Sequence, residues 1–238
     1  MSFRHCMALV SGLVLVAACG PSPSNRDGGN GPDAYTGPTG TINGTVWAPG
    51  NAPGMVPAGH EIPVFGALVW TTYSPALGIP TQAYCELCVD TPGASTTTDH
   101  QGRFSLVNIV PGNYWLNIQK GQFRLEQQVL VGPNEVIDLP AQNSTLPSLH
   151  DPANGQWIPK IALVTGGWDR LEDVLAKMGL GEIYGDGALK GDTALFDLYA
   201  GDGGPAWFNQ VPYQHAGSVY DLFLDLNRLS QYHIVFVP

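Results

Sequence analysis

The sequence predicts a β-sandwich followed by a small α/β segment, and three observations support this. Thirty glycines and twenty prolines, with only 13% charged residues, are typical of turn-rich β proteins rather than helical bundles. Short apolar or alternating runs bounded by turn residues follow one another between residues 40 and 140. From about residue 157 the rhythm changes to strand, glycine turn and helix, which is typical of a parallel sheet.

The first region is predicted to contain seven strands. Each is an apolar or alternating run that ends near glycine, proline, asparagine or aspartate. The predicted ranges are Thr41–Trp47, Pro63–Tyr73, Ser95–Thr98, Arg103–Asn108, Asn113–Gln119, Gln122–Val131 and Glu135–Pro140. So many short strands in about a hundred residues favour a sandwich of two sheets.

One stretch of this region predicts a hairpin together with its core. Asp99 and Gly102 close a turn, because the carboxylate caps backbone amides and the glycine supplies positive φ. Alternate residues of the two strands that follow point to the same side of the sheet. The residues predicted to fill the core are Phe104, Leu106, Ile109, Tyr114, Leu116 and Ile118.

The same residues resemble a known family. Thr98-Asp99-His100-Gln101-Gly102-Arg103-Phe104 and Pro111-Gly112-Asn113-Tyr114-Trp115-Leu116 are similar to the Thr-Asp-x-x-Gly-x-Phe and Pro-Gly-x-Tyr-x-Leu hallmark of carboxypeptidase regulatory-like domains. The resemblance covers residues 41–141 and implies a transthyretin-like (prealbumin-like) β-sandwich with a carbohydrate-binding-like fold, which acts as a non-catalytic accessory module. The sequence departs from the family in an insertion, Ser74–Pro92, whose role stays open.

The N-terminus has the features of an export signal. Arg4 precedes an apolar run, Met7–Ala18, that is shorter than the roughly 20 residues of a membrane span. Val16-Ala17-Ala18-Cys19 resembles the bacterial lipobox. This resemblance implies that residues 1–18 are a signal peptide and that the sulfur of Cys19 carries a diacylglyceryl group. The alternative is an ordinary secretory signal with an incidental cysteine.

Residues 19–40 are predicted to be a flexible linker, because glycine, proline, serine, asparagine and aspartate dominate and offer little to bury. Together with the lipid on Cys19, the linker predicts a lipid-anchored protein of the bacterial cell envelope. The outer membrane is the expected membrane, on its periplasmic or surface face. Asn25–Asp33 lacks the ligand spacing of an EF-hand, so we interpret it as linker.

The charge balance limits the expected partners. Ten Lys and Arg against twenty Asp and Glu give a formal net charge of −10. Nucleic acid is therefore not expected, because its binding depends on clustered Lys and Arg. The expected partners are the membrane, through the N-terminal lipid, and a protein or glycan at the envelope. Trp47, Trp70 and Trp115 either contact sugar rings or fill the sandwich core.

Cys85 and Cys88 are the cysteines that remain once the signal peptide leaves and Cys19 is acylated, and both lie in the insertion. An oxidising compartment favours a short-range disulfide between them. Three alternatives stay open: a zinc site to which His60 or His100 adds ligands, a redox Cys-x-x-Cys, and pairing with another chain. No metal site is assigned.

Residues 142–156 are predicted to be a linker and residues 157–238 a partial α/β segment. The predicted elements are the strands Ile158–Thr165 and His233–Val237, and the helices Arg170–Met178, capped by Asp169, and Val219–Gln231, capped by Ser218. The apolar helix faces are Leu171, Val174, Leu175 and Met178, and Leu222, Leu226 and Leu229. A segment with only two or three strands is too small to cover both faces of a parallel sheet. We therefore expect a truncated domain or one completed by another protein.

No catalytic residue and no cofactor are expected. Ile161–Gly167 and Tyr232–Val237 weakly resemble the opening of glutamine-amidotransferase-like domains, but no cysteine follows Cys88 to serve as that family's nucleophile. His60-Glu61 lacks the H-E-x-x-H continuation of a metallopeptidase. We therefore expect a non-catalytic binding or spacer module on a lipid anchor. The alternative is a truncated or partner-completed hydrolase or amidotransferase-like enzyme that carries an accessory β-sandwich.

Overall fold

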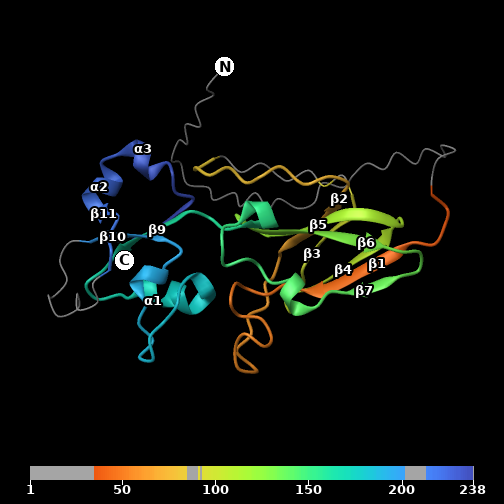
Figure 1. Cartoon of the computed structure of the whole chain (residues 1–238), viewed down its shortest axis with the longest axis horizontal. Coiled ribbons are helices and arrows are strands. Elements are labelled where there is room, and N and C mark those ends of the chain that lie inside the picture. Colours follow the sequence, from red (N-terminus) through yellow and green to blue (C-terminus); the bar gives the residue numbers. More distant parts are fainter. Residues whose placement is uncertain (1–34, 85–90, 92, 202–212, 238) are drawn as a thin grey trace, which may run out of the picture.

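The structure, a computed structural model, describes residues 35–84, 91, 93–201 and 213–237. Within these residues, twelve strands form three sheets and the helices are short. Strands β1–β7 lie at one end of the molecule, and β9–β11 lie with the three α-helices at the other (Figure 1). The β-rich fold that the composition predicts is confirmed.

Strands β1–β8 form two of the sheets. One has the order β4-β1-β7 and the other the order β3-β2-β5-β6-β8. All pairings are antiparallel except that of β1 with β7, which is parallel. The strands are β1 Gly40–Thr45, β2 Leu68–Thr72, β3 Ser95–Thr97, β4 Arg103–Ile109, β5 Gly112–Lys120, β6 Phe123–Val131, β7 Val136–Asp138 and β8 Gln156–Trp157.

All seven strands predicted in this region are present, and the largest difference from the predicted bounds is in the second. The predicted strand Pro63–Tyr73 begins only at Leu68. Gly66 has a φ of +65°, which turns the chain just before that strand. The residues ahead of the turn pair elsewhere, because the amide of Val64 donates to the carbonyl of Val46 at 2.8 Å.

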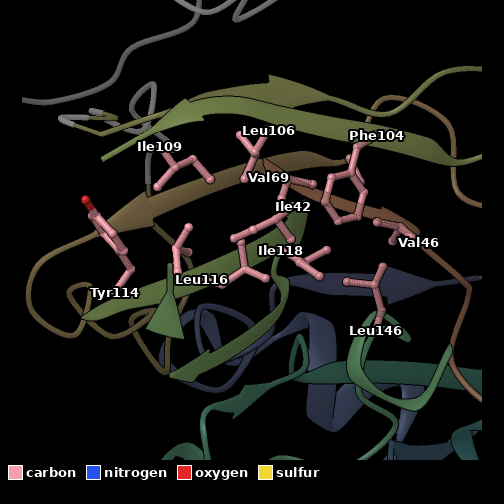
Figure 2. Packing of buried hydrophobic residues seen from close by; sticks show 12 residues of the cluster. Ile42, Val46, Val69, Phe104, Leu106, Ile109, Tyr114, Leu116, Ile118 and Leu146 are labelled. Carbon is pink, nitrogen blue, oxygen red and sulfur yellow. The ribbon is translucent and has the colours of Figure 1, made fainter. Parts of the chain in front are cut away.

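Both sheets contribute to one hydrophobic core. The six residues predicted to fill it, Phe104, Leu106, Ile109, Tyr114, Leu116 and Ile118, are all buried there. Ile42 of β1, Val69 of β2 and Leu146 complete the cluster from other parts of the chain. Figure 2 shows these side chains pointing toward one another between the strands. The predicted core is confirmed.

The turn predicted at Asp99–Gly102 is also confirmed. Oδ1 of Asp99 accepts hydrogen bonds from the amides of Gln101 and Arg103, both at 2.9 Å. These bonds, chiefly that from the Arg103 amide, hold the pKa of Asp99 below its ordinary value. Gly102 has a φ of +71°, and a Cβ on it would lie 2.7 Å from the carbonyl oxygen of Val46. The turn therefore requires glycine for both its conformation and its packing.

Residues 142–156, expected to be a linker, pack against this first region. They begin within the short 3₁₀ turn η1 (Ala141–Asn143) and include a second, η2 (Pro152–Asn154). Ser144 is fully buried, and its Oγ donates to the carbonyl of Thr45 at 2.7 Å. This segment is thus held against β1 by hydrogen bonds and by Leu146 in the core.

The third sheet has the order β11-β10-β9-β12, and all its pairings are parallel. Its strands are β9 Ile161–Thr165, β10 Asp197–Ala200, β11 Gly217–Ser218 and β12 Ile234–Phe236. The predicted parallel sheet is confirmed, with four strands rather than two or three. β10 and β11 lie outside the predicted elements because each is too short to be recognised as an apolar run.

Apolar clusters cover both faces of the parallel sheet. On one face, α1 (Leu171–Leu175) and the wide turn that follows it (Ala176–Leu180) pack on Leu163 and Leu198. On the other, Leu222 packs with Ala162, Val164 and Tyr199. The chain runs from β9 to β10 and β11 on one side and returns to β12 on the other, so the strand order reverses at β9.

The first helix of this part differs from its prediction. Asp169 does not cap it: the cap residue is Arg170, whose side chain makes no capping hydrogen bond. The α-helical turns end at Leu175, and the wider turn that follows rotates the later side chains. Met178, in the wide turn, is 43% exposed, and Val174, within α1, is 49% exposed, so neither joins the buried face.

The second helix is capped as predicted but is shorter. Ser218 begins α2 (Val219–Phe223) in a capping box with Asp221. Asp225 then accepts hydrogen bonds from the amides of Asn227 and Arg228, and this cap begins a new helix, α3 (Leu226–Leu229). Leu226 is therefore 76% exposed instead of lying in line with the buried Leu222.

The two parts of the molecule are packed together through β6 and its neighbours. Phe123, the first residue of β6, contacts both the core of the first two sheets and the cluster under α1. The guanidinium of Arg124 lies 3.9 Å from the centroid of the Trp157 ring, and β8 pairs with β6 at this point. The boundary between the parts is thus a packed interface.

Residues 74–84, the described beginning of the insertion, form a strap across this interface. In Figure 1 this segment (gold) runs along the molecule from β2 toward α3. At the β6 end, the amide of Ala76 donates to Oε2 of Glu126, and Nη1 of Arg124 donates to the carbonyl of Leu77, both at 2.7 Å.

The other end of the strap contacts the parallel-sheet part. The amide of Ala83 donates to the carbonyl of Ser230 at 2.8 Å. Nε2 of His233 lies 2.9 Å from the carbonyl oxygen of Pro80. The strap therefore connects the two parts of the molecule through hydrogen bonds at both of its ends.

Candidate functional site

A groove of about 420 Å³ lies on the three-stranded sheet. Small-molecule sites commonly have volumes of about 300–1,000 Å³. The groove is lined by residues from all three strands and from the segments beside them, and the polar and aromatic ones are Asn43, Thr45, Trp47, Arg103, Phe104, Asp138 and Ser144. It is therefore a concave surface in which an aromatic ring and several polar groups converge.

A row of hydrogen-bonded polar side chains crosses the sheet at the groove. Ser105 of β4, Asn43 of β1 and Asp138 of β7 lie opposite one another in the strand register. Oγ of Ser105 donates to Oδ1 of Asn43 at 2.8 Å, and Nδ2 of Asn43 donates to Oδ1 of Asp138 at 3.0 Å. Each bond fixes the rotamer of the side chain that it joins, so the row is preorganised.

The row keeps hydrogen-bonding capacity for a ligand. An amide nitrogen carries two N–H groups and a carboxylate two oxygens, and only one of each is used within the row. Among the described residues, the second N–H of Asn43 and Oδ2 of Asp138 have no hydrogen-bond partner. A donor and an acceptor are thus available side by side.

Trp47 is fixed by its backbone. Its amide donates to the carbonyl of Ser144 at 3.2 Å, and its carbonyl accepts from the amide of Leu146 at 2.9 Å. Among the three tryptophans considered as sugar contacts, Trp47 alone lines the groove; Trp70 is only 1% exposed and Trp115 is half-buried. Burial of Trp70 agrees with the alternative that the tryptophans fill the interior.

Gly44 allows close packing beneath the groove. It lies opposite Phe104 in the register of β1 and β4. A Cβ on Gly44 would come within 2.8 Å of two atoms of the Phe104 ring. The absence of a side chain therefore lets the aromatic ring lie against β1 and close the floor of the groove.

Arg103 lines the groove, and its guanidinium is hydrogen-bonded to the turn that precedes β4. Nε of Arg103 lies 3.1 Å from Oδ2 of Asp99, and its Nη2 donates to Oε1 of Gln101 at 3.0 Å. Both partners belong to the turn that precedes β4. Two of the five N–H groups of the guanidinium are thus used, and the Arg103 charge is paired with Asp99. The carboxylate of Asp138 also lines the groove and has no ion pair among the described residues.

The carboxyl edge of the parallel sheet is a second place to consider, because ligands of open α/β sheets bind at such edges. Oγ1 of Thr165, at the end of β9, lies 3.3 Å from Nε2 of His215 and 3.2 Å from the carbonyl oxygen of Tyr199. Burial lowers the pKa of His215. The Thr165 hydroxyl donates to that carbonyl, and no described carboxylate orients the imidazole as nucleophilic catalysis requires.

A buried polar cluster lies near the same edge. Nε of Arg170 lies 2.9 Å from Oδ2 of Asp173 and 3.7 Å from Oε1 of Glu172. Oδ1 of Asp173 accepts from the amide of Leu189 at 2.8 Å, which holds the following loop against α1. Oε2 of Glu172 is buried without a hydrogen-bond partner. We interpret this cluster as structural, with one carboxylate imperfectly paired.

Glu172→Gln is expected to raise the free energy of unfolding at neutral pH. Burial raises the pKa of Glu172 above its ordinary value of 4.5, so the folded state holds the proton more tightly than the unfolded state. The stability that this proton contributes is fully present below pH 4.5 and is lost as the pH rises through the raised pKa.

Urea unfolding at pH 4 and pH 7 checks this expectation. The variant should gain stability relative to the wild type at pH 7 and much less at pH 4. A variant that is less stable than the wild type at pH 7 would contradict a desolvated carboxylate at this position.

The sites predicted from the cysteines lie outside the described residues: Cys19, Cys85 and Cys88 are not among them. The two histidines considered as zinc ligands are described, and His100 stacks on Phe65 with ring centroids 4.5 Å apart. Across the described ranges, no three His, Cys, Asp or Glu side chains come together as metal ligands do. The lipid anchor and the disulfide stay predictions.

No protein-family model matches this chain, and no curated protein sequence matches it. The likeness to carboxypeptidase regulatory-like domains therefore rests on the residue pattern itself. In the part of the chain that the structure describes, no helix has the length and apolar character needed to cross a bilayer.

Proposed function

We propose that the protein is a lipid-anchored binding module of the bacterial cell envelope, and that its first region is a transthyretin-like β-sandwich. Two sheets that share one core support the sandwich, as does the hairpin at the positions of the family hallmark. Cys19 carries the lipid, and residues 19–40 present the folded part to its partner.

The observation that carries the binding function is the row Ser105–Asn43–Asp138, of which Asn43 and Asp138 line the groove. A polar row on a solvated sheet face contributes little to stability, because water satisfies the same groups when the row is absent. Its fixed geometry, with one donor and one acceptor left over, suits recognition of a polar ligand. The hydrogen-bonded side chains of the row and the nearby ring of Trp47 favour a binding module over a spacer module.

The anchor is tested on the mature protein. Mass spectrometry of the N-terminus is expected to show a chain that begins at Cys19 and carries a diacylglyceryl group. Cys19→Ser should move the protein from the membrane fraction to the soluble fraction. A mature chain that begins elsewhere, or an unmodified Cys19, would overturn this part of the proposal.

The groove is tested with the soluble Cys19→Ser protein in sedimentation with isolated envelopes of the producing bacterium. Asp138→Ala removes a charged hydrogen-bond partner, a loss of about 1.5–3 kcal/mol, which corresponds to roughly a 10- to 100-fold weaker affinity. Val136→Ala is the matched control, because Val136 is exposed on the same face of the same strand and lies outside the groove. Equal binding by both variants would exclude the groove as the binding surface.

A further inference from the structure

The groove combines an aromatic ring with a hydrogen-bonding pair, which is the chemistry of a sugar site. We infer that it binds a neutral glycan, whose apolar ring face packs on Trp47 and whose neighbouring hydroxyls bond to Asn43 and Asp138. This inference rests on the proposed binding function and names the class of ligand.

Trp47 supplies the aromatic surface of the site. A pyranose ring has one face of C–H groups and a rim of hydroxyls, so it needs an aromatic surface next to polar side chains. Trp47 lines the groove, and its backbone is hydrogen-bonded at both the amide and the carbonyl. A backbone held in this way loses little conformational entropy when a ligand binds.

Asn43 and Asp138 supply the polar groups of the site. A hydroxyl both donates and accepts, and two neighbouring hydroxyls need a donor and an acceptor close together. Nδ2 of Asn43 and Oδ1 of Asp138 lie 3.0 Å apart, so the spare N–H and the spare carboxylate oxygen belong to adjacent groups. The pair therefore fits the vicinal hydroxyls of one sugar ring.

A peptide ligand fits this groove less well. Extended peptides bind mainly by adding main-chain hydrogen bonds to an unpaired sheet edge. The floor of the groove is β1, which is paired with β4 on one side and with β7 on the other. Recognition here must come from side chains, as it does for sugars.

An anionic ligand is also disfavoured. The chain has a net charge of −10, and the carboxylate of Asp138 lies in the groove itself. Arg103, the one cation among the described residues that line the groove, is engaged by Asp99 and Gln101. A polyanion would meet repulsion that this arginine does not offset, so the glycan is neutral.

The experiment measures sedimentation of the soluble Cys19→Ser protein with envelopes that have been treated in two ways. Periodate cleaves vicinal diols and so destroys the sugar groups that the protein would bind; it is quenched before the protein is added. Protease removes proteins from the envelopes and leaves the glycans. We expect binding to fall at least about tenfold after periodate and to survive protease. Soluble neutral hexasaccharides of glucose, xylose and N-acetylglucosamine then serve as competitors, and at least one should displace the protein.

Two positions link the result to the groove. Asp138→Asn keeps the shape of an exposed side chain and removes its charge. Trp47→Ala removes the aromatic ring, and Trp47→Phe, which keeps a smaller ring, is used should Trp47→Ala fail to fold. Asp138→Asn and Trp47→Ala are each expected to weaken binding to untreated envelopes by roughly tenfold or more and Trp47→Phe by less, while Val136→Ala leaves it unchanged. Binding that survives periodate but not protease would overturn the glycan and leave the groove as a protein-binding surface. Absence of binding to untreated envelopes, or equal binding by Asp138→Asn, would overturn the proposed function itself.

Discussion

Gly102→Ala is expected to lower the free energy of unfolding by roughly 2–5 kcal/mol. The left-handed conformation at φ +71° costs a residue with a Cβ about 1–2 kcal/mol. The new Cβ would also lie 2.7 Å from the carbonyl oxygen of Val46 and 2.9 Å from Cβ of Pro63, and such overpacking costs about 1–3 kcal/mol. Urea unfolding of the wild type and the variant at pH 7 measures the loss.

Gly121→Ala is the matched control for this prediction. Gly121 also has positive φ, +55°, but a Cβ on it would meet nothing within 4 Å. It should therefore lose only the conformational cost of about 1–2 kcal/mol. If both variants lose the same stability, the close approach of the Asp99–Gly102 turn to Val46 is not what requires glycine.

Leu116→Ala is expected to cost about 2–5 kcal/mol, because it leaves a cavity in a core whose walls come from two sheets. Leu116 is fully buried, and it lies on β5 among the residues shown in Figure 2. Thermal or urea unfolding measures the effect.

Leu130→Ala provides the comparison for this variant. Leu130 lies on the neighbouring strand β6 and is 66% exposed, so its truncation should change stability by no more than about 0.5 kcal/mol. A small effect at Leu116 with a large one at Leu130 would mean that the inward and outward faces of these strands are exchanged.

The hairpin and its core could be predicted from the sequence because their determinants are local. Asp99 and Gly102 define the turn within four residues, and the alternation from Phe104 onward places every second side chain on one face. The same local logic identified Ser218 as a cap, since a hydroxyl at a helix start satisfies amides two and three residues later.

The groove could not be predicted in the same way. Asn43, Ser105 and Asp138 occupy outward positions of predicted strands, where polar residues are unremarkable. Their meeting depends on β1 pairing with β7 in parallel, between residues 95 positions apart in the chain. Neither periodicity nor turn chemistry determines which strands become neighbours.

The helices near the parallel sheet show a different limit. Apolar residues at helical spacing predicted one continuous helix over Val219–Gln231, but Asp225 competes by capping a second helix within it. Val174 likewise has the spacing of a buried helix position, but α1 is only five residues long and Val174 is exposed. Side-chain hydrogen bonds and helix length override the hydrophobic pattern in both cases.

The position of Phe123 in two hydrophobic clusters has a thermodynamic consequence. A ligand that binds only the folded groove adds RT ln(1 + [L]/Kd) to the free energy of unfolding. Phe123 and the strap contact both parts, so we expect that opening of the first core also weakens the contacts of the parallel sheet. A ligand that binds the groove as proposed is then expected to raise the resistance of the parallel sheet to proteases.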